Sequence, residues 1–211
     1  MNIDITYLLF VLVAIVLSMT LHEAMHAFTS NWLGDDTAKL QGRLTLNPIS
    51  HIDPVMTIAL PLILAALGAP PFGAAKPVPF NPARVKWDEF GAALVGLAGP
   101  FTNLVLGFVA FLIASALGVT QFSTLGLFLQ VFILVNLAFF VFNMLPIPPL
   151  DGSRALYAIA PDSIRRGMEA LEQYGILLVF AIVFLFNAQL GLFMTRSIDA
   201  ILTLFTRLTG N

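Results

Sequence analysis

The chain has 211 residues, of which 58% are hydrophobic and only 10% are charged. Soluble domains usually carry about 25% charged residues, so a chain of this composition is expected to have lipid around it. The net charge of −2 excludes the basic surface that binding to nucleic acid needs, and the lack of cysteine excludes disulfides and thiolate metal ligands. Any transition metal must then be held by imidazole and carboxylate groups, which suit zinc.

Hydropathy predicts an all-α polytopic membrane protein, with residues 1–211 forming a single membrane-embedded domain. Residues 6–33 form a long apolar helix that Gly34 ends. No Lys or Arg precedes this helix, so we expect it to be retained and not cleaved as a signal peptide. After a polar, turn-rich stretch, residues 55–69 are apolar again. A run of about 15 residues containing Pro61 is more typical of a re-entrant or interfacial segment than of a span.

The second half of the chain is expected to hold most of the spanning helices. Residues 70–90 are rich in proline and read as extended or turn structure, which makes 55–90 a re-entrant or extended region. Two full-length helices, an amphiphilic segment and a C-terminal helical hairpin then follow, at residues 91–118, 122–145, 152–173 and 174–208. We therefore predict about five transmembrane helices around a three-helix catalytic core.

The first helix contains His22, Glu23 and His26 in the pattern HExxH. The spacing puts both imidazoles on one face of the helix, where they can bind one ion. Glu23 projects about 100° round the helix from His22, within reach of a water on that ion. The pattern also arises by chance in soluble helices. However, inserting each ionisable group deep into a membrane costs roughly 2.5–3.5 kcal/mol. A role in packing alone therefore explains three such groups in one helix poorly.

A catalytic zinc site needs a further protein ligand, and His51, Asp53 and Asp151 are the candidates. Asp53 precedes Pro54, a pattern that fits a helix N-cap equally well. His51 can be a hydrogen-bonded loop histidine or a substrate contact. Asp151 precedes Gly152, which permits close backbone approach, although Asp151 can also cap the helix that follows.

Two asparagines are candidates for binding the substrate. Asn103 lies between Gly99 and Gly107, which recur every four residues and form a face on which helices can approach closely. It can bond across helices or contact the substrate beside the zinc. Asn143 adjoins a proline-broken segment whose backbone groups need partners. Asn136 matches no motif and is given no role.

Three segments together resemble the site-2 protease family of intramembrane metalloproteases. They are residues 22–26 (HEAMH), 99–103 (GPFTN) and 143–152 (NMLPIPPLDG). The resemblance implies one zinc ion per chain, Asp151 as the third ligand and a role for Asn143 in holding the substrate backbone. Segments 41–54 and 70–82 look like the small bacterial branch, and no run of residues is long enough for a PDZ or CBS domain.

The shared ion also predicts a topology. If His26 and Asp151 bind one ion, helices 6–33 and 122–145 run parallel and helix 91–118 runs opposite to them. One face then receives eight Lys and Arg residues and the other none, a strong positive-inside signal. The eight are Lys39, Arg43, Lys76, Arg84, Lys86, Arg154, Arg165 and Arg166. We expect a multi-pass protein of the cytoplasmic membrane, with the N-terminus outside and the active-site face cytoplasmic.

The expected function is zinc-dependent hydrolysis of peptide bonds in membrane-spanning protein substrates, with Glu23 as general base. A substrate helix must unwind locally before water can attack it. Residues 70–82 and 143–150 can receive the unwound segment as an added strand, although their prolines donate no main-chain hydrogen bonds. The alternatives are a zinc-dependent transport protein, which would usually show internal repeats, and a non-cleaving pseudoprotease, which has no need of Glu23.

Overall fold

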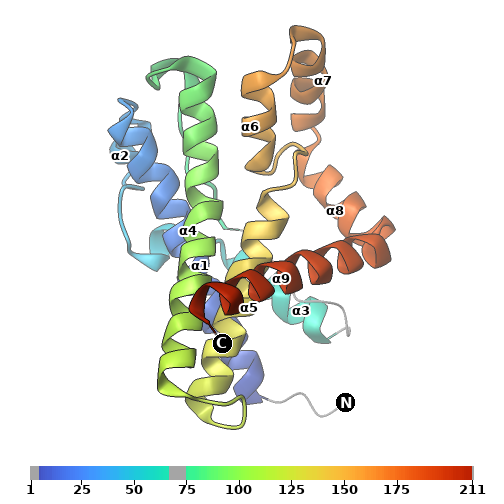
Figure 1. The fold of residues 1–211 in the computed structure, drawn as a ribbon. Coiled ribbons are helices and arrows are strands. Elements are labelled where there is room, and N and C mark those ends of the chain that lie inside the picture. Colours follow the sequence, from blue (N-terminus) through green and yellow to red (C-terminus); the bar gives the residue numbers. More distant parts are fainter. Residues whose placement is uncertain (1–4, 67–74, 211) are drawn as a thin grey trace.

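The computed structural model describes residues 5–66 and 75–210, in which every regular element is helical. Three long helices stand upright side by side (Figure 1): α1 (Ile5–Trp32), α4 (Asp88–Leu117) and α5 (Thr124–Asn143). At 1.5 Å per residue they measure about 42, 45 and 30 Å, enough to cross a hydrocarbon core of about 30 Å. Helices α1 and α5 run in one direction and α4 in the other, as predicted.

The ends of these helices follow local rules, and their bounds agree with the predicted ranges within three residues. Gly34, just past α1, has a φ of 109°, which favours glycine. Gly118 caps α4 in the left-handed conformation. Ser123 begins α5, where its hydroxyl accepts a hydrogen bond from the N–H of Gly126.

The surface of the bundle is apolar. Leu9, Val13 and Leu17 on α1 are exposed, as are Phe101 and Val105 on α4. Soluble monomers rarely expose such continuous apolar patches, whereas lipid tails match them. By length and composition all three long helices qualify as membrane spans. The structure is that of a multi-pass membrane protein.

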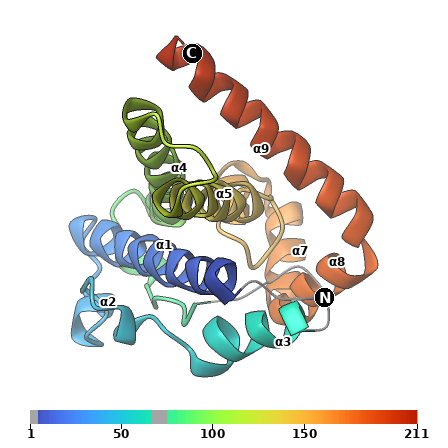
Figure 2. The same ribbon diagram turned by 90° about the horizontal axis from the view of Figure 1, so that it is seen from below.

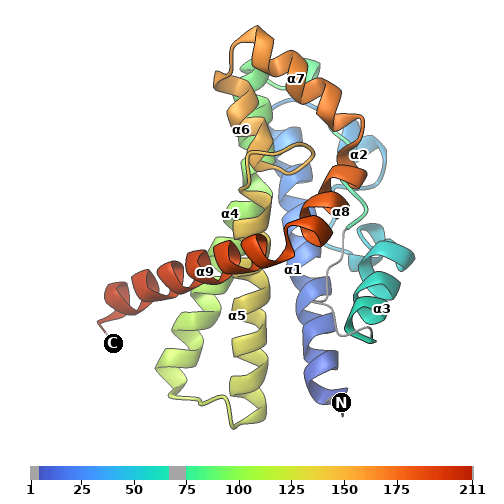
Figure 3. The ribbon, with the colours of Figure 1, turned by 90° about the vertical axis from the view of Figure 1, so that its right-hand side faces the viewer.

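The chain between α1 and α4 begins with short helices, α2 (Thr37–Leu40), η1 (Pro48–Ser50), η2 (Pro54–Ala59) and α3 (Leu60–Ala66). Asp53 caps η2 by accepting hydrogen bonds from the N–H groups of Val55 and Met56, which confirms the N-cap interpretation. Helix α3 lies beside α1, on the side away from α4 and α5 (Figures 2 and 3). The continuous apolar helix Pro54–Leu64 is too short to be a span. Residues 67–74 of the predicted re-entrant region lie outside the described residues.

Residues 75–81 are extended, as predicted, and precede the single turn η3 (Pro82–Arg84). The backbone of this stretch is bonded to the chain around the end of α1. The N–H of Lys76 donates to the carbonyl of His51, that of Asn81 to the Asp35 carboxylate, and that of Lys86 to the Leu33 carbonyl. These bonds keep the extended stretch beside α1.

The C-terminal region differs from the predicted hairpin. It forms α6 (Gly152–Ile159), α7 (Asp162–Glu172), α8 (Gly175–Leu185) and α9 (Asn187–Thr209). Helices α7 and α8 meet at an 84° bend, and α9 crosses the bundle (Figures 1 and 3), with the Phe205 ring 4.7 Å from that of Phe108. The described residues contain three candidate spans, or four if α7 and α8 count as one, where the sequence predicts about five. The difference arises because α8 has 11 residues and Arg196 and Asp199 interrupt the apolar run of α9.

Candidate metal centre

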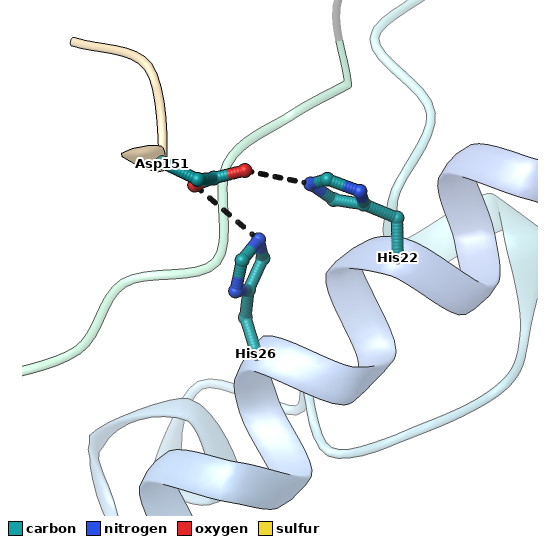
Figure 4. A group of neighbouring side chains, drawn as sticks. All are labelled: His22, His26 and Asp151. Carbon is teal, nitrogen blue, oxygen red and sulfur yellow. Dashed lines mark hydrogen bonds and ion pairs between the residues drawn. The ribbon is translucent and has the colours of Figure 1, made fainter. Parts of the chain in front are cut away.

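Two imidazoles and one carboxylate converge inside the bundle (Figure 4). The Nε2 of His22 lies 3.0 Å from one carboxylate oxygen of Asp151, and the Nε2 of His26 lies 3.5 Å from the other. One ligand atom from each residue falls within 4.8 Å of the others, so the group could hold a metal ion. The chain thus brings together the HExxH pair of α1 and a residue 125 positions after His26.

Local structure explains why these three side chains meet. The helical spacing of His22 and His26 puts their ring centroids 4.7 Å apart. Asp151 precedes α6 but makes no side-chain capping bond, so its carboxylate is free to face α1. A Cβ on Gly152 would lie 2.4 Å from the carbonyl oxygen of Met144. Only glycine therefore permits the tight return of the chain that brings Asp151 to this point.

Gly99 of α4 leaves space in front of both imidazoles. A Cβ there would lie 2.4 Å from the Nε2 of His26 and 2.6 Å from the Nε2 of His22. A zinc ion lies about 2.0–2.1 Å from an imidazole nitrogen, so glycine keeps clear the volume that an ion would use. Two imidazoles and a carboxylate form one of the common ligand sets of catalytic zinc. The residues present therefore fit this metal.

The other nitrogen of each imidazole is hydrogen-bonded. The Nδ1–H of His22 donates to the Asn103 side-chain oxygen at 2.6 Å, and that of His26 donates to the Val95 carbonyl at 2.7 Å. Such partners fix the tautomer and leave Nε2 as a lone-pair donor. The Asn103 amide in turn donates to the side-chain oxygen of Asn136 at 2.9 Å. Asn103 is fully buried and in this arrangement faces His22 and Asn136.

Glu23 and Asp151 line a cavity of about 240 Å³, together with His26 and Val78. One oxygen of the Glu23 carboxylate accepts a hydrogen bond from the Val78 N–H at 2.8 Å. Burial alone would raise the pKa of Asp151, but the charges and hydrogen bonds of His26 and His22 more than offset this and lower its pKa below the ordinary value. This effect depends on protons that the imidazoles carry while no ion is bound; a metal ion would need both imidazoles neutral and the Asp151 carboxylate ionised.

His51 and Asn143 lie apart from this cavity lining. His51 is buried, and its Nε2–H donates to the Thr45 carbonyl at 2.9 Å. Asn143 is half-buried at the end of α5, where its amide donates to the Phe139 carbonyl at 3.0 Å. Their contact with substrate stays a prediction.

Sequence reasoning missed two contributors to the site, Asn136 and the backbone N–H of Val78. Asn136 had a signal, because a polar residue inside an apolar helix is costly unless it has a partner. The Val78 N–H had none, because any residue except proline carries the same donor.

The fold and the site together define a helical membrane protein with an HExxH-type metal centre, and comparison with known proteins agrees. The model of a family described as Peptidase family M50 matches residues 118–188. The "Putative zinc metalloprotease YwhC" of Bacillus subtilis is 41% identical over 207 residues, which cover 93% of this chain and 91% of the relative. Two proteins named "Putative zinc metalloprotease Rip2" are more distant. The protein of Mycolicibacterium smegmatis is 34% identical, and the match covers 80% of this chain and 64% of the relative. The protein of Mycobacterium tuberculosis is 33% identical, and the match covers 80% of this chain and 63% of the relative.

No solved structure gives a significant match. The chain belongs to the site-2 protease family, peptidase family M50, and is a zinc metalloprotease. Zinc is accordingly its cofactor.

Proposed function

We propose that the chain hydrolyses peptide bonds of membrane-spanning protein substrates, and that His22, His26 and Asp151 hold one zinc ion per chain for this reaction. The observation that carries the proposal is the convergence of two Nε2 atoms and one carboxylate within 4.8 Å. Each comes with a feature that suits a ligand: hydrogen-bonded Nδ1 atoms on the imidazoles and an Asp151 carboxylate that makes no capping bond to its own helix.

In this proposal Glu23 moves the protons. When bound, zinc supplies a Lewis acid and makes a water acidic enough to lose a proton near neutral pH. Glu23 takes that proton from the attacking water and passes it to the leaving amine. The Val78 N–H holds one oxygen of the Glu23 carboxylate at 2.8 Å, which leaves the other oxygen for the proton.

The depth of the centre supports an intramembrane substrate. His22 lies ten residues before the end of α1, or about 15 Å along the helix. A peptide bond must reach this depth in an unwound segment. If that segment pairs with residues 76–79, it pairs with their carbonyl oxygens. The N–H groups of Lys76 and Val78 are already bonded, and Pro77 and Pro79 have none.

We further propose that the chain lies in the cytoplasmic membrane with its N-terminus outside. Helices α2, α6 and α7 gather at the end of the bundle where α1 ends (Figure 3). The eight Lys and Arg residues counted above fall in loops and short helices after α1, and Arg154, Arg165 and Arg166 lie on α6 and α7. Positive residues of this kind stay on the cytoplasmic side, which supports a cytoplasmic active-site face.

A single variant tests the proposal. The purified protein is reconstituted in liposomes made from bacterial lipid, with membrane proteins extracted from bacterial membranes as substrates. New peptide termini are then read by mass spectrometry. Glu23→Gln should keep the Val78 hydrogen bond and the zinc but lose all cleavage. Glu89→Gln, in the first turn of α4 and half-exposed, makes the same chemical change away from the site and should cleave like wild type.

Other outcomes separate the alternatives. Cleavage that persists in Glu23→Gln would contradict the role of Glu23, and zinc flux through liposomes in both proteins without any cleavage would favour transport. Zinc binding with neither cleavage nor flux in the wild type would favour a pseudoprotease.

A further inference from the structure

The cavity beside the metal centre contains one permanent positive charge among the described residues that line it. This is Arg154, which shares the cavity with Glu23, His26 and Asp151. A third acid, Glu172, completes the charged side chains of the lining. Nothing in the chemistry proposed above uses Arg154.

Arg154 is fixed in place by its surroundings. It lies in the first turn of α6, three residues after Asp151. A Cβ on Gly96 of α4 would lie 2.9 Å from the Cβ of Arg154, so the stem of the arginine packs directly on α4. Its guanidinium lies 5.8 Å from the centre of the Phe80 ring, within the range of a cation–π contact. The charge is therefore held between α4 and the extended residues 75–81.

Glu172 is the more loosely held partner. Its carboxylate is 2.5 Å from the Arg154 guanidinium, and the two side chains are 42% and 31% exposed. Glu172 ends α7, just before the 84° bend into α8. Exposed pairs of this kind contribute little to stability, so another carboxylate can replace Glu172 at small cost. Arg154 would remain, because its stem and ring contacts do not depend on the pair.

We propose that Arg154 is a specificity-determining residue that binds the side-chain carboxylate of an Asp or Glu in the substrate. Glu172 occupies the position of that carboxylate when no substrate is bound. A guanidinium binds a carboxylate through two parallel hydrogen bonds, which gives direction as well as strength. Because Arg154 lies one helical turn from Asp151, the acidic residue falls within about three residues of the scissile bond. This inference rests on the proposed proteolysis.

The test uses the intact protein in liposomes with bacterial membrane proteins, as above, and scores the residues around every cleavage that Glu23→Gln abolishes. Wild-type cleavage sites should be enriched in Asp and Glu within three positions of the cut. Arg154→Glu should cleave these acidic sites at least about tenfold less, as expected for losing a hydrogen bond between charged groups, and should favour sites with Lys or Arg. Arg166→Glu, on the exposed face of α7, makes the same charge change outside the cavity and should keep the wild-type preference.

A second variant protects the test against a misfolded arginine mutant. Glu172→Gln removes the competing carboxylate, leaves Arg154 in place and should raise the preference for acidic sites. Wild-type cleavage without acidic enrichment, or an unchanged site preference in folded, zinc-loaded Arg154→Glu, would overturn the inference and leave the protease intact. Enrichment in Lys and Arg would overturn it in favour of Glu172 as the binding group. If the wild type makes no cuts that depend on Glu23, the proposed function itself fails.

Discussion

The side-chain oxygen of Asn103 accepts a hydrogen bond of 2.6 Å from the Nδ1 of His22. This contact joins α4 to α1 and sets the tautomer of a proposed zinc ligand, because a proton on Nδ1 leaves the Nε2 lone pair for metal. Asn103 can itself present its oxygen or its amide. Its amide donates to the Asn136 side-chain oxygen at 2.9 Å and, over a longer 3.3 Å, to the Ser18 carbonyl, so Asn136 and Ser18 together determine which end faces His22.

Asn136 makes the shorter of these two bonds and should therefore affect zinc affinity although it contacts no ligand. We expect Asn136→Leu to weaken zinc binding about 10–100-fold, as losing an outer hydrogen-bond partner of a ligand typically does. A competition titration with a chromogenic chelator measures the affinity. Gln130→Leu, on the exposed face of the same helix, should bind zinc like the wild type. Equal affinity of both variants would show that Asn103 is oriented by something other than Asn136.

Gly99 should be essential for metal binding and Gly107 should not, although both lie on α4. In Gly99→Ala the new Cβ would lie 2.4 Å from the Nε2 of His26, in the space that an ion needs. Alanine favours helix by about 1 kcal/mol over glycine, so the helix should persist while bound zinc disappears. In Gly107→Ala the Cβ would meet the flexible end of Leu137 at 3.2 Å, and zinc should stay. Metal content and circular dichroism of the two proteins distinguish these results, and a full zinc content in Gly99→Ala would place the ion elsewhere.

Asp35 should stabilise the extended residues 75–81 in a pH-dependent way. It is fully buried. Burial raises its pKa, but hydrogen bonds from Thr37 and from the backbone N–H of Asn81 more than offset this, so the pKa lies below its ordinary value. A carboxylate with a lowered pKa stabilises the fold above the pKa of the unfolded state, about 3.9, and loses that effect as the pH falls towards the folded value.

Asp35→Asn should accordingly lower the free energy of unfolding at pH 7 by about 1–3 kcal/mol, and the deficit should shrink below about pH 4. Thermal unfolding in detergent at several pH values measures this. The control is Asp36→Asn. Asp36 is half-exposed and pairs with Arg84 at 2.8 Å, so its loss should cost no more than about 1 kcal/mol. A deficit in Asp35→Asn that is constant with pH would show that its charge is not involved.

Much of the site could be predicted because its signals are local. The spacing of His22 and His26 on an apolar helix is visible in the sequence, and so is the proline run that delivers Asp151. The periodic Gly99, Asn103 and Gly107 predict the close approach of helices, and the structure has Gly99 against the imidazoles and Gly107 against Leu137. Long apolar runs also predict α1, α4 and α5 with their relative directions.

The remaining features depend on which residues meet in three dimensions. The Glu23–Val78 contact uses a backbone donor that no side chain marks. The course of α9 across the bundle depends on packing of residues such as Phe205 against α4. The apolar content of α9 alone predicts the second arm of a helical hairpin. The sequence allows Asn103 to be either a substrate contact or a bond across helices, since a single sequence does not reveal which neighbour it faces.

X-ray absorption at the zinc edge of the purified wild-type protein tests the proposed centre most directly. We expect one zinc per chain with two imidazole nitrogens at about 2.0–2.1 Å and carboxylate or water oxygens at about 2.0–2.2 Å. The imidazole signal should fall by half in His26→Ala. A wild-type spectrum without imidazole scattering, or one that His26→Ala leaves unchanged, would contradict zinc binding by His22, His26 and Asp151.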